Sequence, residues 1–219
     1  MLSSKPTVAP VDVVQEKTIT QENDGGSSAG TQGDPHYETW KKFHYEMHSQ
    51  CDLVLLADEA FEGGKGLDIH TRTKIVRYWA YNKSVVVRIG DDVLEVSGNS
   101  WYFNGIYMGK VKSIGGFPVT MKEQGPKKRK FIIDLDSVYP NETIVLSNFN
   151  EFTRVQFPQG SEEAFGRTRG MLGDYKTGKL LARDGVTEFD DFYAFAQDWQ
   201  VRHEIFGMYG IFFPFLVSF

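Results

Sequence analysis

The sequence predicts a mainly β protein, a two-sheet antiparallel β-sandwich with one short C-terminal helix. From Tyr37 onward, apolar residues recur at every second position in short runs, which is the period of a half-buried strand. Gly, Asn, Asp and Pro stand between these runs, as they do in turns between antiparallel strands. A clear helical period occurs once, near the C-terminus. Many short strands separated by turns favour a sandwich or barrel over alternating strands and helices.

The chain divides into three predicted parts. Residues 1–32 contain no Trp, Tyr or Phe and are rich in Ser, Thr, Pro, Gly and Gln, so they predict a disordered leader or linker. Residues 33–202 form the predicted domain, and 203–219 form an apolar tail. The leader has no basic segment followed by an apolar run, which a secretory signal requires. We therefore expect either an intracellular protein or a part of a longer precursor.

The segment "SVVVRIGDDVLEVSG" shows the strand pattern most clearly. Val85 and Val87 share one face before a turn at 90–92, and Leu94 and Val96 then resume the alternation. This pattern predicts a hairpin.

Seven other runs predict strands by the same alternation or by their β-branched and aromatic content. They are "DLVLLA" (52–57), "LDIHTR" (67–72), "KIVRYWAY" (74–81), "WYFNGIYMG" (101–109), "KFIIDLDSV" (130–138), "ETIVLSNF" (142–149) and "FTRVQF" (152–157).

The predicted helix lies in "DDFYAFAQDWQV". Phe192, Phe195 and Trp199 fall at i, i+3 and i+7, the spacing of one helical face. Asp190 or Asp191 can cap the first turn. This apolar face predicts a helix packed on the sheets.

Charge and motifs argue against several classes of function. The net charge of -5 and the isoelectric point near 5.6 are not those of a nucleic-acid-binding face. The basic run "PKKRK" (126–130) lies between two predicted strands and indicates a solvated hairpin tip. Phosphate-binding loops, nucleophile elbows and paired-cysteine zinc patterns are absent from the sequence. We expect no cofactor and no enzyme activity.

The segment "HYEMH" offers a candidate metal site. On a strand, His44, Glu46 and His48 share one face, and two imidazoles with one carboxylate can bind a transition metal. The alternative is that this face is solvated while Tyr45 and Met47 enter the core, and we favour that interpretation.

Three further features bear on modification and location. Cys51 is the only cysteine, so it is a free thiol and most resembles a small buried hydrophobe. Asn82 and Asn141 begin glycosylation sequons near predicted turns. Residues 205–219 carry no charge, so the tail is a candidate for membrane contact, although it is shorter than a membrane span.

Two distant groups of motifs resemble the von Willebrand factor type D domain. They are "GDPHYETW", "FHYEM" and "CDLVL" near the start, and "RGMLGDYKTG", "DGVTEFDDF" and "FAQDWQV" near the end. The resemblance covers about residues 33–201. It implies a noncatalytic β-sandwich for adhesion and assembly within a larger extracellular or cell-surface protein. Its partners would be other protein domains or matrix components.

Several residues depart from the family pattern. Lys41-Lys42 replace an Asp-Gly pair, and Leu172 replaces a cysteine of the closing motif, while Cys51 keeps a family cysteine position. The resemblance therefore implies that the family's disulfides are missing here, so that burial must supply the stability.

The same comparison implies a weak or lost calcium site. The family's ligand positions correspond to Lys41, Asp174, Lys176, Asp190 and Asp191. An ammonium group supplies no oxygen ligand and repels Ca²⁺, although calcium binding remains an alternative. We expect Lys41, with Lys176, to take the place of the cation and to pair with Asp174 or Asp190.

Two other functions remain open. Some relatives cleave themselves at the Asp-Pro bond of this motif, and here Asp34 and Pro35 form that bond with His36 as a possible proton donor. The structural alternative is that Pro35 directs the chain into the first strand.

The last alternative is a carbohydrate-binding β-sandwich that uses exposed aromatic side chains. The candidates are Trp79, Tyr81, Trp101 and Tyr102, and burial of the tryptophans is the competing expectation.

Overall fold

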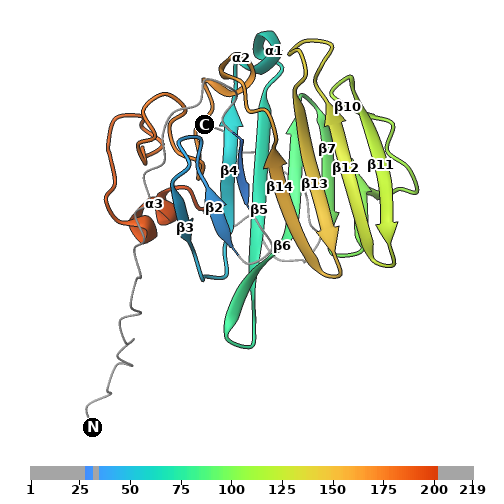
Figure 1. The fold of residues 1–219 in the computed structure, drawn as a ribbon, viewed down its shortest axis with the longest axis horizontal. Helices are drawn as coiled ribbons and strands as arrows, with labels where there is room; N and C mark the ends of the chain where they lie inside the picture. Colours follow the sequence, from blue (N-terminus) through green and yellow to red (C-terminus); the bar gives the residue numbers. More distant parts are fainter. Residues whose placement is uncertain (1–27, 32–34, 202–219) are drawn as a thin grey trace, which may run out of the picture.

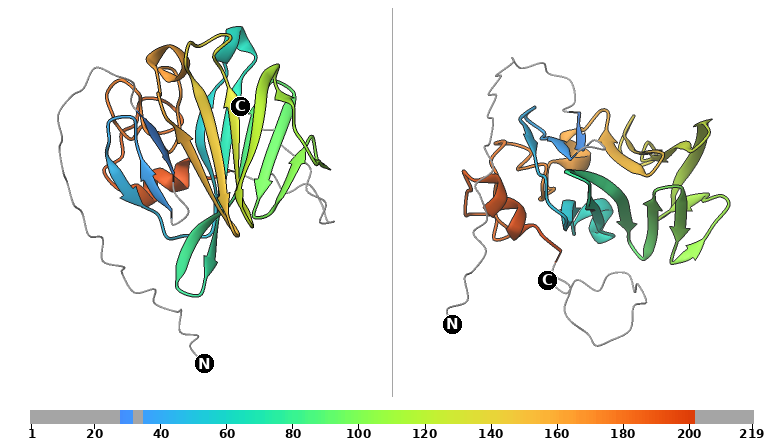
Figure 2. Two further views of the ribbon diagram at one scale, coloured as in Figure 1. Left: turned by 45° about the vertical axis from the view of Figure 1, so that its right-hand side comes forward. Right: turned by 90° about the horizontal axis from the view of Figure 1, so that it is seen from below.

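A computed structural model describes residues 28–31 and 35–201. Two antiparallel sheets form a β-sandwich with no closed barrel (Figure 1). The view from below in Figure 2 shows the two layers edge-on. The predicted fold class is therefore confirmed. The predicted leader up to residue 27, Asp34 and the apolar tail lie outside the described residues.

The first sheet has eight strands in the order β10-β11-β12-β13-β14-β1-β2-β3. They are β1 (Ala29–Thr31), β2 (His36–Glu38), β3 (His44–Glu46), β10 (Ser113–Ile114), β11 (Phe117–Gly125), β12 (Lys128–Asp134), β13 (Thr143–Phe149) and β14 (Phe152–Phe157). The second sheet has six strands, which follow one another in chain order. They are β4 (Asp52–Asp58), β5 (Leu67–Val76), β6 (Trp79–Ile89), β7 (Asp92–Ser97), β8 (Ser100–Phe103) and β9 (Ile106–Tyr107).

The alternating residues form the core as predicted. Val85, Val87 and Leu94 are fully buried, as are Phe131 and Ile133 on the facing sheet. Because successive side chains of a strand point to opposite faces, each run contributes one face to the space between the sheets.

Strand β1 corrects the predicted end of the leader. Ala29–Thr31 lie between β14 and β2 and pair with both. A Cβ on Gly30 would lie 2.2 Å from the Val155 carbonyl oxygen, so glycine permits the close approach of β14. The sheet therefore begins inside the segment that we predicted to be leader.

A second correction concerns "KIVRYWAY", which we predicted as a single strand. The chain turns at Arg77-Tyr78, between β5 and β6, and Val76 pairs with Trp79. Arg77 has a φ of 62°. Residues 74–79 thus form the tip of a hairpin, which extends below the sandwich in Figure 1.

The C-terminal helix is confirmed, and two single-turn helices accompany it. Helix α3 (Phe192–Asp198) is capped by Asp191, whose side chain accepts a hydrogen bond from the Tyr193 amide. The short helices are α1 (Phe61–Gly64) and α2 (Glu162–Phe165). Within the described ranges, no helix is long and apolar enough to cross a membrane.

Candidate functional site

The two ends of the domain meet at one side of the sandwich. We call residues 35–51 the opening segment and residues 166–201 the closing segment. Figure 1 shows the closing segment, in orange and red, beside β2 and β3. The Trp40 amide donates to the Leu172 carbonyl at 3.3 Å, and the Tyr45 hydroxyl donates to the Met171 carbonyl. Segments that carry distant sequence motifs are therefore in direct contact.

Aromatic stacking fills the space between the two segments. The Trp40 ring lies 5.3 Å from Phe165 and 5.3 Å from Tyr175, measured between centroids. Phe192 of α3 stacks on Tyr45 at 4.8 Å. Trp40 is only 1% exposed. Such ring pairs add to the stabilisation from burial alone, so this junction is part of the core.

The closing segment also hydrogen-bonds to edge strand β4. Amide and carbonyl groups of Ala57 and Arg169 exchange two hydrogen bonds, and Val54 donates to the Trp199 carbonyl at 2.9 Å. A Cβ on Gly170 would lie 2.6 Å from the Leu55 carbonyl oxygen. The glycine therefore allows the closing segment to approach the β4 backbone.

The predicted calcium residues are distributed along the closing segment. The Asp174 carboxylate accepts hydrogen bonds from the Thr177 amide at 2.7 Å and from the Thr177 hydroxyl at 2.6 Å. Burial acts to raise the pKa of Asp174, but the hydrogen bonds from Thr177 and the nearby charge of Lys176 outweigh it and lower the pKa. This carboxylate serves as the acceptor of a tight turn.

The predicted salt bridge does not form. The stem of Lys41 packs beside Gly178, but within the described part of the chain neither Lys41 nor Lys176 forms an ion pair with Asp174 or Asp190. Lys176 instead pairs with Glu162 at 3.4 Å. Lys176 still lies near enough to Asp174 for its charge to lower the pKa of that carboxyl.

The acidic residues do not converge. Asp191 caps α3, and Asp190 is exposed before it. No group of three or more His, Cys, Asp or Glu side chains in residues 28–31 and 35–201 could hold a metal ion.

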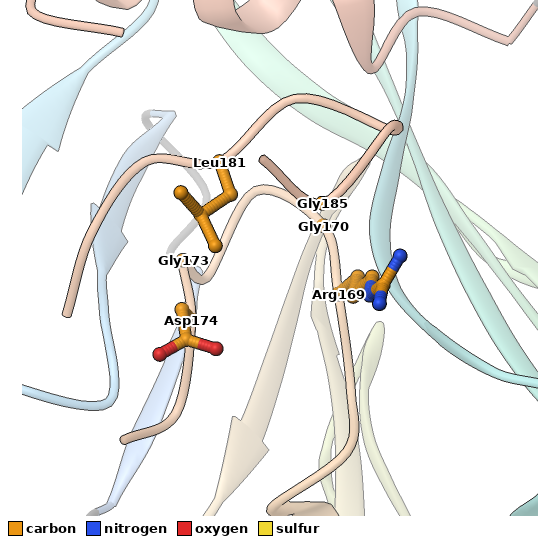
Figure 3. Close-up of a pocket in the computed structure, with 6 residues that line it drawn as sticks. All are labelled: Arg169, Gly170, Gly173, Asp174, Leu181 and Gly185. Carbon is orange, nitrogen blue, oxygen red and sulfur yellow. The ribbon is translucent and has the colours of Figure 1, made fainter. Parts of the chain in front are cut away.

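A shallow hollow lies beside Asp174 (Figure 3). Its lining residues are Arg169, Gly170, Gly173, Asp174, Leu181 and Gly185. Its volume of about 70 Å³ is well below the several hundred Å³ of typical small-molecule sites. In Figure 3 the side chains of Arg169 and Asp174 point away from each other. The hollow can hold water or a single small group.

The histidines of the opening segment form a cluster that differs from the predicted set. The β2–β3 register places His36 opposite Glu46, and His36 Nδ1 lies 2.8 Å from Glu46 Oε1. His48 Nε2 lies 3.1 Å from Glu46 Oε2. His44 lies opposite Glu38 instead. We missed His36 because its proximity depends on the pairing of two strands. Tyr45 and Met47 enter the core as predicted.

The predicted cleavage site lies at the start of β2. The Pro35 carbonyl accepts a hydrogen bond from the Met47 amide at 3.2 Å, and His36 is held by Glu46 as described above. Asp34 lies outside the described residues. The two described residues of this motif are thus held at the start of β2, the second strand from the edge of the eight-stranded sheet.

The modification candidates differ in accessibility. Asn82 is fully buried in β6 and donates to the Thr31 hydroxyl at 2.7 Å, so the expectation that it lies near a turn and can carry a glycan is wrong for the folded chain. Asn141 is exposed in a turn. Cys51 is a half-buried free thiol whose sulfur lies 3.1 Å from the Ser49 hydroxyl.

The four aromatic candidates do not form one surface. Trp79 is 55% exposed, whereas Trp101 is only 6% exposed. Tyr81 packs on Phe152 with centroids 4.3 Å apart, and Tyr102 packs edge-on against Tyr107. Only Trp79 of this set offers a largely open ring.

No protein-family model matches this chain, and no curated protein matches it.

Proposed function

We propose that this chain contains a noncatalytic adhesion or assembly module similar to the von Willebrand factor type D domain, within a larger extracellular or cell-surface protein. The observation that carries the proposal is the contact between the opening and closing segments. The two groups of motifs on which the resemblance rests are packed together: Trp40 contacts Tyr175, and Tyr45 contacts Phe192 and Met171. Motifs that belong to one domain family should share such a structural unit.

The partners of this module are other protein domains or matrix components. A folded β-sandwich held by burial, with a free thiol and without disulfides, suits a role in which its surface is recognised. Asn141 is the exposed position for a glycan if the module is secreted.

Bead aggregation tests the proposal. Beads that carry the full chain are mixed with beads that carry the same chain or with beads coated with collagen, laminin or fibronectin. We expect at least one pair to aggregate, and we expect the full chain in solution to compete. A Trp40→Ala chain, which loses the packing between the segments, serves as the control. Failure of every pair would contradict the adhesion function.

A second candidate function is self-cleavage at Asp34-Pro35. The observation in its favour is the His36–Glu46 contact of 2.8 Å, which holds an imidazole one residue after the Asp34-Pro35 bond, where it can act as the proton donor to the prolyl nitrogen. Mass spectrometry after mild acid incubation tests it. We expect a fragment that begins at Pro35, and we expect none from Asp34→Ala. An intact chain under all conditions would rule out cleavage.

A further inference from the structure

The tip of the β5–β6 hairpin gathers more exposed large hydrophobic side chains than any other described turn or strand end. All six residues from 74 to 79 are exposed. Four of them are large hydrophobic residues, Ile75, Val76, Tyr78 and Trp79, and Tyr78 reaches 92% exposure. A soluble surface rarely gathers such residues without a function.

The hairpin extends beyond the strands that flank it. Pairing of β5 with β4 ends at Arg72, and pairing of β6 with β7 begins at Ser84. Between these positions, β5 and β6 pair only with each other. Figures 1 and 2 show the resulting ribbon projecting from the sandwich. At the tip, Trp79 meets the His48 ring edge-on at 5.6 Å between centroids, while Tyr78 is 92% exposed.

The base of this ribbon is fixed. Thr73 and Asn82 are buried, Asn82 donates to Thr31, and the Thr153 hydroxyl donates to the Asn82 carbonyl at 3.1 Å. A two-stranded ribbon is only marginally stable by itself. These anchors fix the base of the ribbon to the sandwich.

The turn at the tip has large side chains where the backbone conformation favours glycine or asparagine. Two-residue hairpin turns favour Asn and Gly because these tolerate positive φ. Here the turn residues are Arg77 and Tyr78, and Arg77 has a φ of 62°. A strained non-glycine residue at an exposed tip indicates that its side chain has a use.

The acidic and basic residues of the ribbon are unequal in number, and all of its charged side chains are basic. Residues 69–90 contain no Asp or Glu, although the whole chain has a net charge of -5. Lys74 precedes the apolar residues, Arg77 lies between Val76 and Tyr78, and both are exposed. The tip therefore presents apolar and aromatic groups together with cations, a combination found where proteins enter the headgroup region of a membrane.

We propose that the β5–β6 tip docks on an anionic lipid bilayer, with Ile75, Val76, Tyr78 and Trp79 in the interface and Lys74 and Arg77 on the lipid phosphates.

The strand register places the apolar residues of the tip on both faces of the ribbon, since Val76 pairs with Trp79 and Ile75 pairs with Ala80. Insertion end-on into a bilayer covers both faces at once, whereas a protein groove would cover mainly one. This inference is independent of the proposed assembly function.

Tryptophan fluorescence provides a local readout. Trp79 is exposed, while Trp40, Trp101 and Trp199 are buried. Adding vesicles of phosphatidylcholine with phosphatidylserine to the full chain should shift the emission of Trp79 to the blue, and brominated lipids should quench it. Trp79→Phe should remove the shift but retain most of the binding in co-sedimentation.

Paired variants test each part of the contact. Lys74→Ala/Arg77→Ala should weaken binding about 30-fold, because each basic residue at an anionic surface contributes about 1 kcal/mol. Tyr78→Ser/Trp79→Ser should weaken it about tenfold or more. The matched controls are Lys110→Ala/Lys112→Ala and Ile106→Ser/Tyr107→Ser, which remove exposed groups elsewhere and should bind normally.

Three results would overturn the proposal. The first is unchanged vesicle binding by both tip variants, which would assign the contact to another segment such as the apolar tail. The second is equal binding to vesicles without phosphatidylserine. The third is a blue shift of Trp79 that needs no lipid and rises with protein concentration, which would make the tip a contact between copies of the chain.

Discussion

The junction between the opening and closing segments and the β5–β6 tip use the same kinds of residue in opposite ways. At the junction, Trp40 is 1% exposed and stacks on other rings, whereas Trp79 at the tip is 55% exposed. Both lie in aromatic-rich runs of sequence. Local composition alone therefore does not decide whether an aromatic side chain is buried. Burial depends on how many strands flank the residue and on whether another segment of the chain covers it.

Trp40→Ala should have the largest effect. Truncating a large buried aromatic residue typically costs about 3–5 kcal/mol, and here it also separates the two segments. The matched variant Trp79→Ala should change the unfolding free energy by about 0.5 kcal/mol or less. Urea unfolding measures both values. Similar losses of unfolding free energy in the two variants would contradict the assignment of Trp40 to the core and Trp79 to the surface.

Gly30→Ala should have the next largest effect. The new methyl group would meet the Val155 carbonyl oxygen, and strain of this kind typically costs about 1–3 kcal/mol. Gly109→Ala is the control, because nothing lies within 4 Å of a Cβ at that position. The same unfolding experiment compares the two. A neutral Gly30→Ala variant would mean that β1 is not held between β2 and β14.

Tyr45→Phe should cost about 1 kcal/mol, because it leaves the Met171 carbonyl without its donor. Tyr78→Phe removes the same hydroxyl from an exposed ring and should leave the melting temperature unchanged. Differential scanning fluorimetry can resolve this difference. An equal response of the two variants would show that the hydroxyl of Tyr45 is as well solvated as that of Tyr78.

The smallest effect concerns pH. Hydrogen bonds and Lys176 overcome the effect of burial and lower the pKa of Asp174 from its ordinary value of 3.8. Its stabilisation is therefore complete above that value and is lost as the pH falls through the lower, folded pKa. The melting-temperature difference between the wild type and Asp174→Asn should shrink below about pH 4. A difference that stays constant down to acid unfolding would contradict this assignment.

The sequence predicted those parts of the fold that depend on local periodicity. Val85, Val87 and Leu94 alternate within one hairpin, so their burial could be inferred without knowing the distant partner strands. Strand β1 was missed because "AGT" has no strong apolar signal and because its partners β14 and β2 define it. The turn at Arg77-Tyr78 was missed because it lacks the usual Gly or Asn. The predicted strand 101–109 was also wrong as a single strand, since it turns at Asn104-Gly105 between β8 and β9.

The candidate site was less predictable for the same reason. Single residues such as Asp191 could be placed at a helix start by a local rule. The His36–Glu46 contact depends on cross-strand register, and the burial of Asn82 depends on the position of Thr31 in β1. Contacts and burial that depend on segments distant in the sequence cannot be predicted until the pairing of those segments is known.

The position of β1 also constrains the order in which the chain can fold. All six strands of the second sheet are consecutive, so that sheet can form as soon as residue 107 has left the ribosome. The first sheet is different, because Ala29 pairs with Phe157. Closing such a long loop slows folding. Strand β1 can therefore complete its pairing only after β14 has been synthesised, and one of its edges stays unpaired until then.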